Sequence, residues 1–293
     1  MFFRTDMAVE RRDVYKAAIK NDNIDGIESY EEIEDEYKLT FVKITNENGE
    51  KAIGKKQGDY ITIDLKRINH LSEDEERKII NKISDVIKEL LKKNGLEKGE
   101  ILVVGLGNLF SVPDSLGNKV VQNIEITRHV KIYLPDLIDK NVRSISAISP
   151  GVLGTTGIET FEIVEGVKNK IKPAAIIVID SLCSKSIERL NKSIQISDTG
   201  IIPGGGVDNA RQEISKETLG IPVITIGVPT VVDAASLVID TINMSKMDLK
   251  FDEDKFINEM KLNDFNFIVT FKEIDELIEN MVDIISEGIN NAL

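Results

Sequence analysis

The chain has 293 residues with a formal net charge of -13, and 41% of its residues are hydrophobic while 30% are charged. This balance is typical of a globular protein with a large core, and the negative charge argues against direct binding to nucleic acid or an anionic membrane, which need clustered Lys and Arg. The single cysteine, Cys183, excludes an internal disulfide and a multi-cysteine metal site, so we expect a reducing cytoplasm. No apolar run approaches the ~20 residues of a membrane span.

The N-terminal third predicts an acidic surface followed by a small β structure. Residues 11–36 are rich in Glu and Asp, as solvated surface is. Residues 37–44 and 60–65 alternate apolar and polar side chains, which predicts strands, and Asn48-Gly49 indicates a tight turn between them. We therefore expect an N-terminal β addition over about residues 37–65.

Buried strands alternate with helices in the rest of the chain. Ser72 to Glu75 forms a capping box, where a long helix is expected to begin. Apolar runs predict strands at 101–104, 144–148, 174–179 and 223–226. Helical periodicity predicts helices near 119–128, 159–170, 182–190, 232–247 and 272–293. The alternation predicts one α/β domain with a mostly parallel sheet and helices on both faces.

The stretch from Ile101 to Gly117 holds the first candidate site residue. Its apolar run breaks into Gly105-Leu-Gly107-Asn108, where the backbone can turn tightly, and Asp114 follows in a loop. Asp114 is therefore expected just beyond the carboxyl end of a strand, where ligands bind in open α/β sheets. The alternative is a dinucleotide-binding turn, but Phe110 stands where the third glycine of that fingerprint belongs.

Asp180 is the second candidate, because it ends the apolar run of residues 174–180 and should lie at the same sheet edge as Asp114. Two carboxyl groups held close together cannot both ionise, so such a pair can share a proton or activate a water molecule. The alternative for Asp180 is a helix N-cap before Ser181 and Leu182. The residue pattern alone leaves both interpretations open.

Three polar loops could also supply amides or hydroxyls to a cleft, and the first and last of them follow predicted strands. For each loop taken alone, turns and helix caps are the simpler explanation. The loops span residues 149–157, 197–206 and 227–233. His70 and His129 are the only histidines, and we expect a structural role for both. The sequence has no His-Glu-x-x-His motif and no Walker loop, which argues against zincins and ATPases.

Taken together, the motifs resemble the germination protease family of spore-forming bacteria, and the resemblance runs from Arg4 to about Met247. The motifs that carry it, in family order, are Gly105-Leu-Gly-Asn108, Pro113-Asp-Ser-Leu-Gly117, Thr127-Arg-His129, Gly154-Thr-Thr-Gly-Ile-Glu159, Ile179-Asp-Ser-Leu182, Ile196-Ser-Asp-Thr-Gly200, Pro203-Gly-Gly-Gly-Val207 and Ile226-Gly-Val-Pro-Thr-Val-Val-Asp-Ala234.

The resemblance implies a homotetrameric endopeptidase of the spore core that degrades small, acid-soluble spore proteins during germination. It also implies a fold like that of hydrogenase-maturation peptidases. We expect this protein to use no metal and no cofactor. The two proposed catalytic aspartates of the family match Asp114 and Asp180. Substrate-binding or supporting residues are expected within the same motifs, at Gly107, Asn108, Glu159, Asp198, Thr199 and Asp233.

The family is made as a zymogen whose pro-segment is removed at a site that imitates the substrate. Thr5-Asp-Met-Ala-Val-Glu10 fits that pattern, which implies a cut between Asp6 and Met7. Residues 1–6 would then be the pro-segment, which is shorter than usual, and 7–293 the α/β peptidase domain. Asp208 departs from the family pattern, because a glycine is expected there.

Two other functions stay open at this point. A nickel-dependent maturation peptidase of the same fold would need a nitrogen ligand near the strand ends, and His129 is the plausible one. A binding protein without enzymatic activity could use the same cleft.

Overall fold

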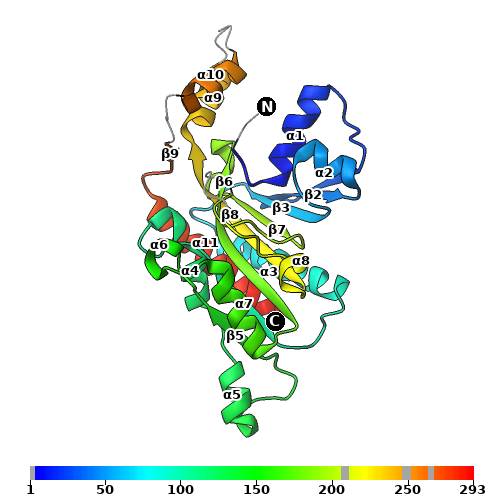
Figure 1. Cartoon of the computed structure of the whole chain (residues 1–293), viewed down its shortest axis with the longest axis vertical. Helices are drawn as coiled ribbons and strands as arrows, with labels where there is room; N and C mark the ends of the chain where they lie inside the picture. The colour runs from blue at the N-terminus through cyan, green and yellow to red at the C-terminus, as the bar shows by residue number, and fades with distance from the viewer. Residues whose placement is uncertain (1–3, 206–210, 246–251, 263–266) are drawn as a thin grey trace.

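A computed structural model describes residues 4–205, 211–245, 252–262 and 267–293. In this part of the chain, one nine-stranded sheet has the order β1-β2-β3-β7-β8-β6-β4-β5, and β9 pairs with β8 (Figure 1). The strands are β1 (Ile27–Ile33), β2 (Tyr37–Ile44), β3 (Gly58–Leu65), β4 (Ile101–Gly105), β5 (Ile145–Ile148), β6 (Ala175–Ser184), β7 (Ser193–Ser197), β8 (Val223–Asp233) and β9 (Ile268–Val269).

The helices lie between and beside these strands. They are α1 (Ala8–Ile19), α2 (Glu47–Ile53), α3 (Glu73–Lys93), α4 (Leu116–Gln122), α5 (Arg128–Tyr133), α6 (Leu153–Thr156), α7 (Thr160–Ile171), α8 (Lys216–Leu219), α9 (Ala234–Met244), α10 (Glu253–Leu262) and α11 (Ile274–Ala292). Single 3-10 turns occur at η1 (Val112–Asp114), η2 (Pro135–Leu137) and η3 (Ile187–Arg189). None of the helices in the described ranges is long and apolar enough to cross a membrane.

The sheet has a parallel centre and an antiparallel extension. Strand β4 pairs in parallel with β5 and β6, and β6 pairs in parallel with β8. Strands β1, β2 and β3 pair antiparallel with one another, and β3 joins β7, which pairs antiparallel with β8. The N-terminal strands therefore continue the central sheet, and the predicted α/β fold with helices on both faces is confirmed.

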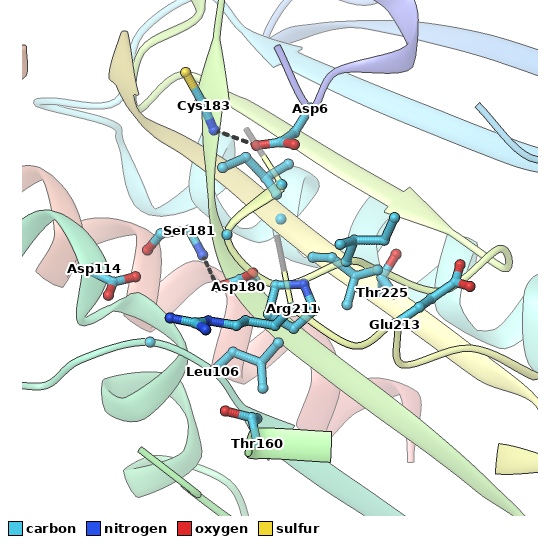
Figure 2. A pocket seen from close by; sticks show the side chains of 18 of the residues that line it. Asp6, Leu106, Asp114, Thr160, Asp180, Ser181, Cys183, Arg211, Glu213 and Thr225 are labelled. Carbon is cyan, nitrogen blue, oxygen red and sulfur yellow. Dashed lines mark hydrogen bonds between the residues drawn. The ribbon is translucent and has the colours of Figure 1, made fainter. Parts of the chain in front are cut away.

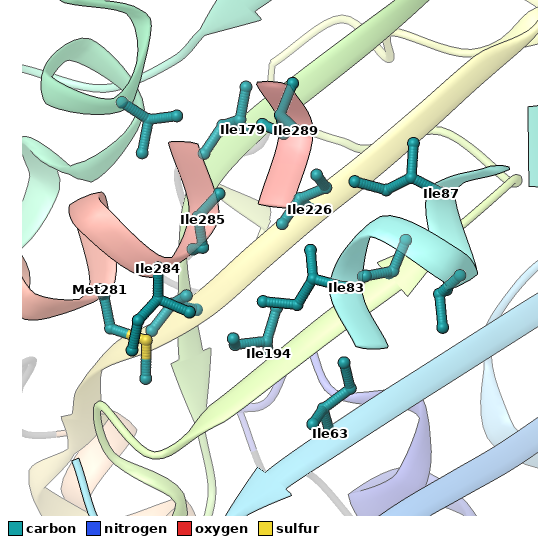
Figure 3. Close-up of a cluster of buried hydrophobic side chains, with 14 of the residues drawn as sticks. Ile63, Ile83, Ile87, Ile179, Ile194, Ile226, Met281, Ile284, Ile285 and Ile289 are labelled. Carbon is teal, nitrogen blue, oxygen red and sulfur yellow. The ribbon is translucent and has the colours of Figure 1, made fainter. Parts of the chain in front are cut away.

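Helices α3 and α11 cover one face of the sheet. Ile83 of α3 and Ile285 of α11 are fully buried against strand residues such as Ile226 (Figure 3). Burying one such side chain contributes about 1.5–3 kcal/mol, so this layer supplies much of the stability of the fold. The capping box at Ser72 and Glu75 begins α3 as predicted. Helix α7 packs on the opposite face through Phe161 and Val164.

The structure corrects several predicted elements. Residues 182–190 do not form a helix, because β6 continues to Ser184 and its pairing with β8 there satisfies the backbone. Strand β8 likewise continues to Asp233, so the helix predicted from Val232 begins instead at Ala234. Its predicted end at Met247 lies outside the described residues.

The N-terminal region also differs from the prediction. Strand β1 and helix α1 occupy much of residues 11–36, which the acidic composition marked only as surface. Asn48-Gly49 is not a tight turn but part of α2, because the Asn46 side chain accepts hydrogen bonds from both amides and so caps that helix. The predicted helix at 119–128 is split, since α4 ends at Gln122 and α5 begins at Arg128.

Candidate active site

A cavity of about 790 Å³ opens on the α7 face of the sheet, where β4 ends and β6 and β8 continue. Asp180 of β6 and Gln195 of β7 both lie directly opposite Gly227 of β8. Residues directly opposite in neighbouring strands project from the same face, so the two side chains enter one cavity across a glycine. Asp180, Gly227 and Gln195 form the floor of this cavity.

Asp114 is placed by the turn that follows β4. Gly107 has φ +106°, a conformation that L side chains rarely adopt, and a Cβ on it would lie 2.0 Å from the backbone oxygen of Asp114. The Asn108 backbone N–H donates to Oδ2 of Asp114 at 3.0 Å. The glycine turn predicted from the sequence therefore holds the Asp114 carboxylate at the cavity wall.

Asp180 lies within β6 and does not end it, so the predicted strand end at this residue is wrong. The helix N-cap alternative also fails, because the next four residues are extended strand. Its Oδ1 accepts the Ser181 backbone N–H at 2.9 Å, and the residue is 6% exposed. Because β4 stops at Gly105, the described residues place no strand beside this edge of β6 beyond Ile179. Asp180 lies near Asp114, whose negative charge raises its pKa.

The two carboxyl groups differ in acidity. Burial raises the pKa of Asp114 to about 6, against a smaller opposing effect of the Asn108 amide. Burial also raises the pKa of Asp180 well above its usual value, and the negative charges of Asp114 and Asp6 raise it further. Near neutral pH the pair can therefore hold one proton, with Asp114 ionised and Asp180 protonated, which is the combination needed for general base and general acid.

The other predicted site residues divide into two groups. Those that line the cavity with the two aspartates are Asp6, Gly107, Asn108, Glu159 and Thr199. Glu159 also pairs with Arg211 at 3.7 Å. Asp198 and Asp233 are not among the lining residues. Asp198 pairs with Lys93 at 2.7 Å, and Asp233 pairs with Arg4 at 3.3 Å. Asp208 lies outside the described residues.

The N-terminal segment enters the cavity beside the open edge of β6 (Figure 2). The Asp6 backbone N–H donates to the Cys183 carbonyl at 2.8 Å, and the Cys183 N–H donates to Oδ2 of Asp6 at 2.9 Å. Met7 is fully buried beside Val9 and Leu182. The segment with the expected cleavage pattern therefore occupies part of the same cavity as the two aspartates.

Sequence analysis did not single out Gln195 or Lys55, which also line the cavity. Gln195 accepts the Ala8 N–H at 2.7 Å and donates to the Asp6 carbonyl at 3.3 Å. The alternation Ser193-Ile-Gln-Ile-Ser197 would have been the signal for a strand with one polar face. Lys55 follows α2, and no local pattern connects it with a site.

No group of three His, Cys, Asp or Glu side chains within the described ranges is arranged to hold a metal ion. His129 lies in the first turn of α5, and it does not line the cavity. The nitrogen ligand that the nickel-dependent alternative needs is therefore not beside the two aspartates.

The fold and cavity define a class, an α/β protein in which two carboxyl groups of different acidity converge in a deep cleft, as in hydrolases that activate water. A family model described as germination protease matches residues 4–251. The chain belongs to the germination protease family and is a protease.

Curated relatives match it along almost their whole length. The germination protease of Caldanaerobacter subterraneus subsp. tengcongensis is 46% identical, with 99% of this chain and 94% of the relative covered. That of Clostridium tetani is 45% identical, with 100% and 96% covered. That of Bacillus pumilus is 36% identical, with 99% and 93% covered.

Among solved structures, the chain is similar to the NiFe hydrogenase maturation protease HycI from Thermococcus kodakarensis. The TM-score is 0.37 and the identity 16%, over 70% of this chain and 98% of HycI. A similarity of this size does not by itself establish a shared fold.

Proposed function

We propose that this protein is an endopeptidase that degrades small, acid-soluble spore proteins in the spore core during germination. Membership of the germination protease family supports this substrate class. The observation that carries the proposal is the convergence of Asp114 and Asp180 in one cavity, with the pKa of both raised by burial.

In the proposed mechanism, ionised Asp114 takes a proton from a water molecule as the water oxygen attacks the peptide carbonyl carbon. Protonated Asp180 stabilises the developing oxyanion and then gives its proton to the amine as the C–N bond breaks. Asp114, now protonated, can return a proton to Asp180 or to water. Asp180 suits the acid role, since its burial and the negative charges of Asp114 and Asp6 all favour its protonated form.

We also propose that the protein is made as a zymogen and that residues 1–6 are its pro-segment. The position of Asp6 inside the cavity supports this, because an occupied cleft cannot admit a substrate at the same place. Cleavage between Asp6 and Met7 would leave residues 7–293 as the peptidase domain.

A homotetramer is part of the same proposal. Helix α5 and η2 project from one end of the molecule (Figure 1) and expose apolar side chains, with Tyr133 79% and Leu137 76% exposed. Clustered exposed apolar side chains are typical of protein–protein contacts.

The proposed function is tested with purified protein that begins at Met7 and a purified small, acid-soluble spore protein. We expect endoproteolysis by the parent, and losses of about 1000-fold or more in Asp114→Asn and Asp180→Asn, since each removes one of the two proton-transferring groups. Asp22→Asn, at a side chain that is 99% exposed and lies outside the cavity, is the matched control and should retain activity. Substantial cleavage by either cavity variant would overturn the assignment of the pair.

A further inference from the structure

Asp6 binds at an edge of β6 through one main-chain hydrogen bond and one side-chain hydrogen bond. Strand β4 ends at Gly105, so beyond Ile179 one edge of β6 has no neighbouring strand within the part of the chain that the structure describes. Asp6 uses both backbone groups of Cys183 at this edge, one through its own N–H and the other through its carboxylate. The bond from the Asp6 N–H could be made by any residue except proline, whereas the bond from the Cys183 N–H requires an acceptor on the side chain, such as a carboxylate.

Gln195 holds the peptide on both sides of the bond expected to be cut. Its Oε1 accepts from Ala8, which fixes the orientation of the amide, and Nε2 is then directed at the Asp6 carbonyl. Gln195 is 8% exposed, so its donor faces little competition from water. The Asp6 carbonyl is the one that water would attack if the bond between Asp6 and Met7 were cleaved.

Lys55 supplies a positive charge to the same region of the cavity. It forms no ion pair in the described part of the chain, whereas Lys56 next to it pairs with Glu213 at 2.8 Å. Burial lowers the pKa of Lys55 to about 8, and the negative charge of Asp6 acts in the opposite direction. A nearby carboxylate stabilises a partly buried ammonium group. Without one, the positive charge of the ammonium group is buried without a compensating negative charge.

We propose that the backbone of Cys183, the Gln195 amide and Lys55 form the subsite that binds an acidic substrate residue immediately before the cleaved bond, and that Asp6 occupies this subsite in the uncut chain. This inference rests on the proposed function. Removal of residues 1–6 frees the Cys183 backbone groups and Nε2 of Gln195. A substrate glutamate or aspartate then takes the place of Asp6, with Lys55 selecting its charge.

The test uses the protein that begins at Met7 and two peptides that differ only in having Glu or Gln before the cleaved bond. We expect the parent to cleave the Glu peptide with a higher kcat/KM by about 10-fold or more, which is the usual size of a charge-assisted contact. Lys55→Gln should lower kcat/KM for the Glu peptide by a similar factor and leave the Gln peptide within about twofold, so that the preference disappears. An equal loss on both peptides, or an unchanged preference, would overturn the role of Lys55.

Two further variants complete the test. Lys51→Gln removes an exposed lysine of α2 outside the cavity and should leave both rates and their ratio unchanged. Gln195→Ala should lower kcat on both peptides by about 10-fold or more without changing their ratio, because Gln195 contacts the backbone common to both. A changed ratio or unchanged rates in Gln195→Ala would contradict its assignment.

The outcomes also separate this subsite from the proposed function. Failure of the parent to cleave the spore protein or either peptide would contradict the proposed function itself. Cleavage of the spore protein together with equal rates on the two peptides would contradict the subsite alone.

Discussion

The backbone oxygen of Asp114 lies 2.0 Å from the position that a Cβ on Gly107 would occupy. No side chain at position 107 can therefore coexist with the observed position of Asp114. The turn after β4 and the acidic side chain of the site are one structural unit, although six residues separate them in the sequence.

Gly107→Ala is expected to lower proteolytic activity by about 100-fold and to destabilise the fold by about 1–3 kcal/mol, since the new methyl group must displace Asp114 and the backbone must adopt a strained φ. Gly166→Ala is the matched control, because this α7 glycine has open space around it and alanine favours a helix by about 1 kcal/mol. Urea unfolding and peptide cleavage measure both effects. Full activity in Gly107→Ala would contradict the proposed role of the turn.

The pH dependence of kcat/KM should follow Asp114 on its acidic side. Because burial raises the pKa of Asp114 to about 6, the base is progressively protonated as the pH falls through this value. We expect kcat/KM to fall about tenfold per pH unit below it, and to fall again at higher pH as Asp180 loses its proton. A rate that is unchanged between pH of about 7 and about 5 would exclude Asp114 as the base.

Asp180 should lower the stability of the folded protein at neutral and alkaline pH. Its pKa is raised on folding, so the folded state binds a proton more tightly than the unfolded state. The free energy of unfolding therefore falls as the pH rises above the unfolded pKa of about 4, until the folded-state pKa is passed. Asp180→Asn avoids this loss and keeps an oxygen that accepts the Ser181 N–H.

We accordingly expect Asp180→Asn to be more stable than the parent at pH of about 8, because the parent must there either keep a proton or bury a negative charge. The advantage should disappear at pH of about 3, where both states of the parent are protonated. Urea titrations at the two pH values measure it. A variant that is less stable than the parent at the higher pH would contradict the assigned burial of an acidic group.

Mild acidification should convert the full-length protein into the form that begins at Met7. Lowering the pH from about 8 to about 6 favours a pair in which Asp180 carries a proton and a fraction of Asp114 stays ionised. We expect a product that begins at Met7 to accumulate, and none to form in Asp180→Asn. Mass spectrometry of the N-terminus before and after the shift measures conversion. A Met1 start in fully active enzyme, or conversion of the Asp180→Asn protein by itself, would contradict autoprocessing.

The exposed apolar end at α5 and η2 should contribute to assembly. Leu137→Asp places a charge on a residue that is 76% exposed in the single chain, so it should leave the fold intact while destabilising a contact that buries Leu137. We expect light scattering to show a smaller assembly for this variant than for the parent. Leu262→Asp, at an 80% exposed position of α10, is the matched control for an added surface charge. An identical mass for the parent and both variants would exclude this end from the interface.

The sequence predicted the parts of the site that depend on local backbone rules. Gly107 was identified because a strand was expected to end in a tight turn, and the structure places it at a positive φ. Asp180 was correctly placed opposite Asp114, but within a strand instead of at its end. The continuation of β6 depends on pairing with Pro229 and Val231 of β8, and no local pattern reveals that pairing.

The residues that bind the N-terminal segment were beyond sequence reasoning for a related reason. Ala8 and Gln195 are 187 residues apart, and their hydrogen bond forms only because β3 joins β7 and brings the N-terminal layer over the central sheet. The same order of strands also brings Lys55 to the cavity. Short-range periodicity cannot predict contacts that arise from the order of strands in a sheet.

The burial of Met7 has a consequence for any cut at Asp6. In the intact chain the Met7 nitrogen is a neutral amide that donates to Oγ1 of Thr5 at 3.0 Å, at the start of α1. Hydrolysis would turn it into an α-amino group with a usual pKa of about 7.7–8.0, a new cation at the end of a helix where the dipole disfavours positive charge. The fully buried Met7 side chain would then be tied to a group that requires water or a carboxylate. The cut chain cannot keep the geometry of the uncut one. We therefore expect processing to be irreversible.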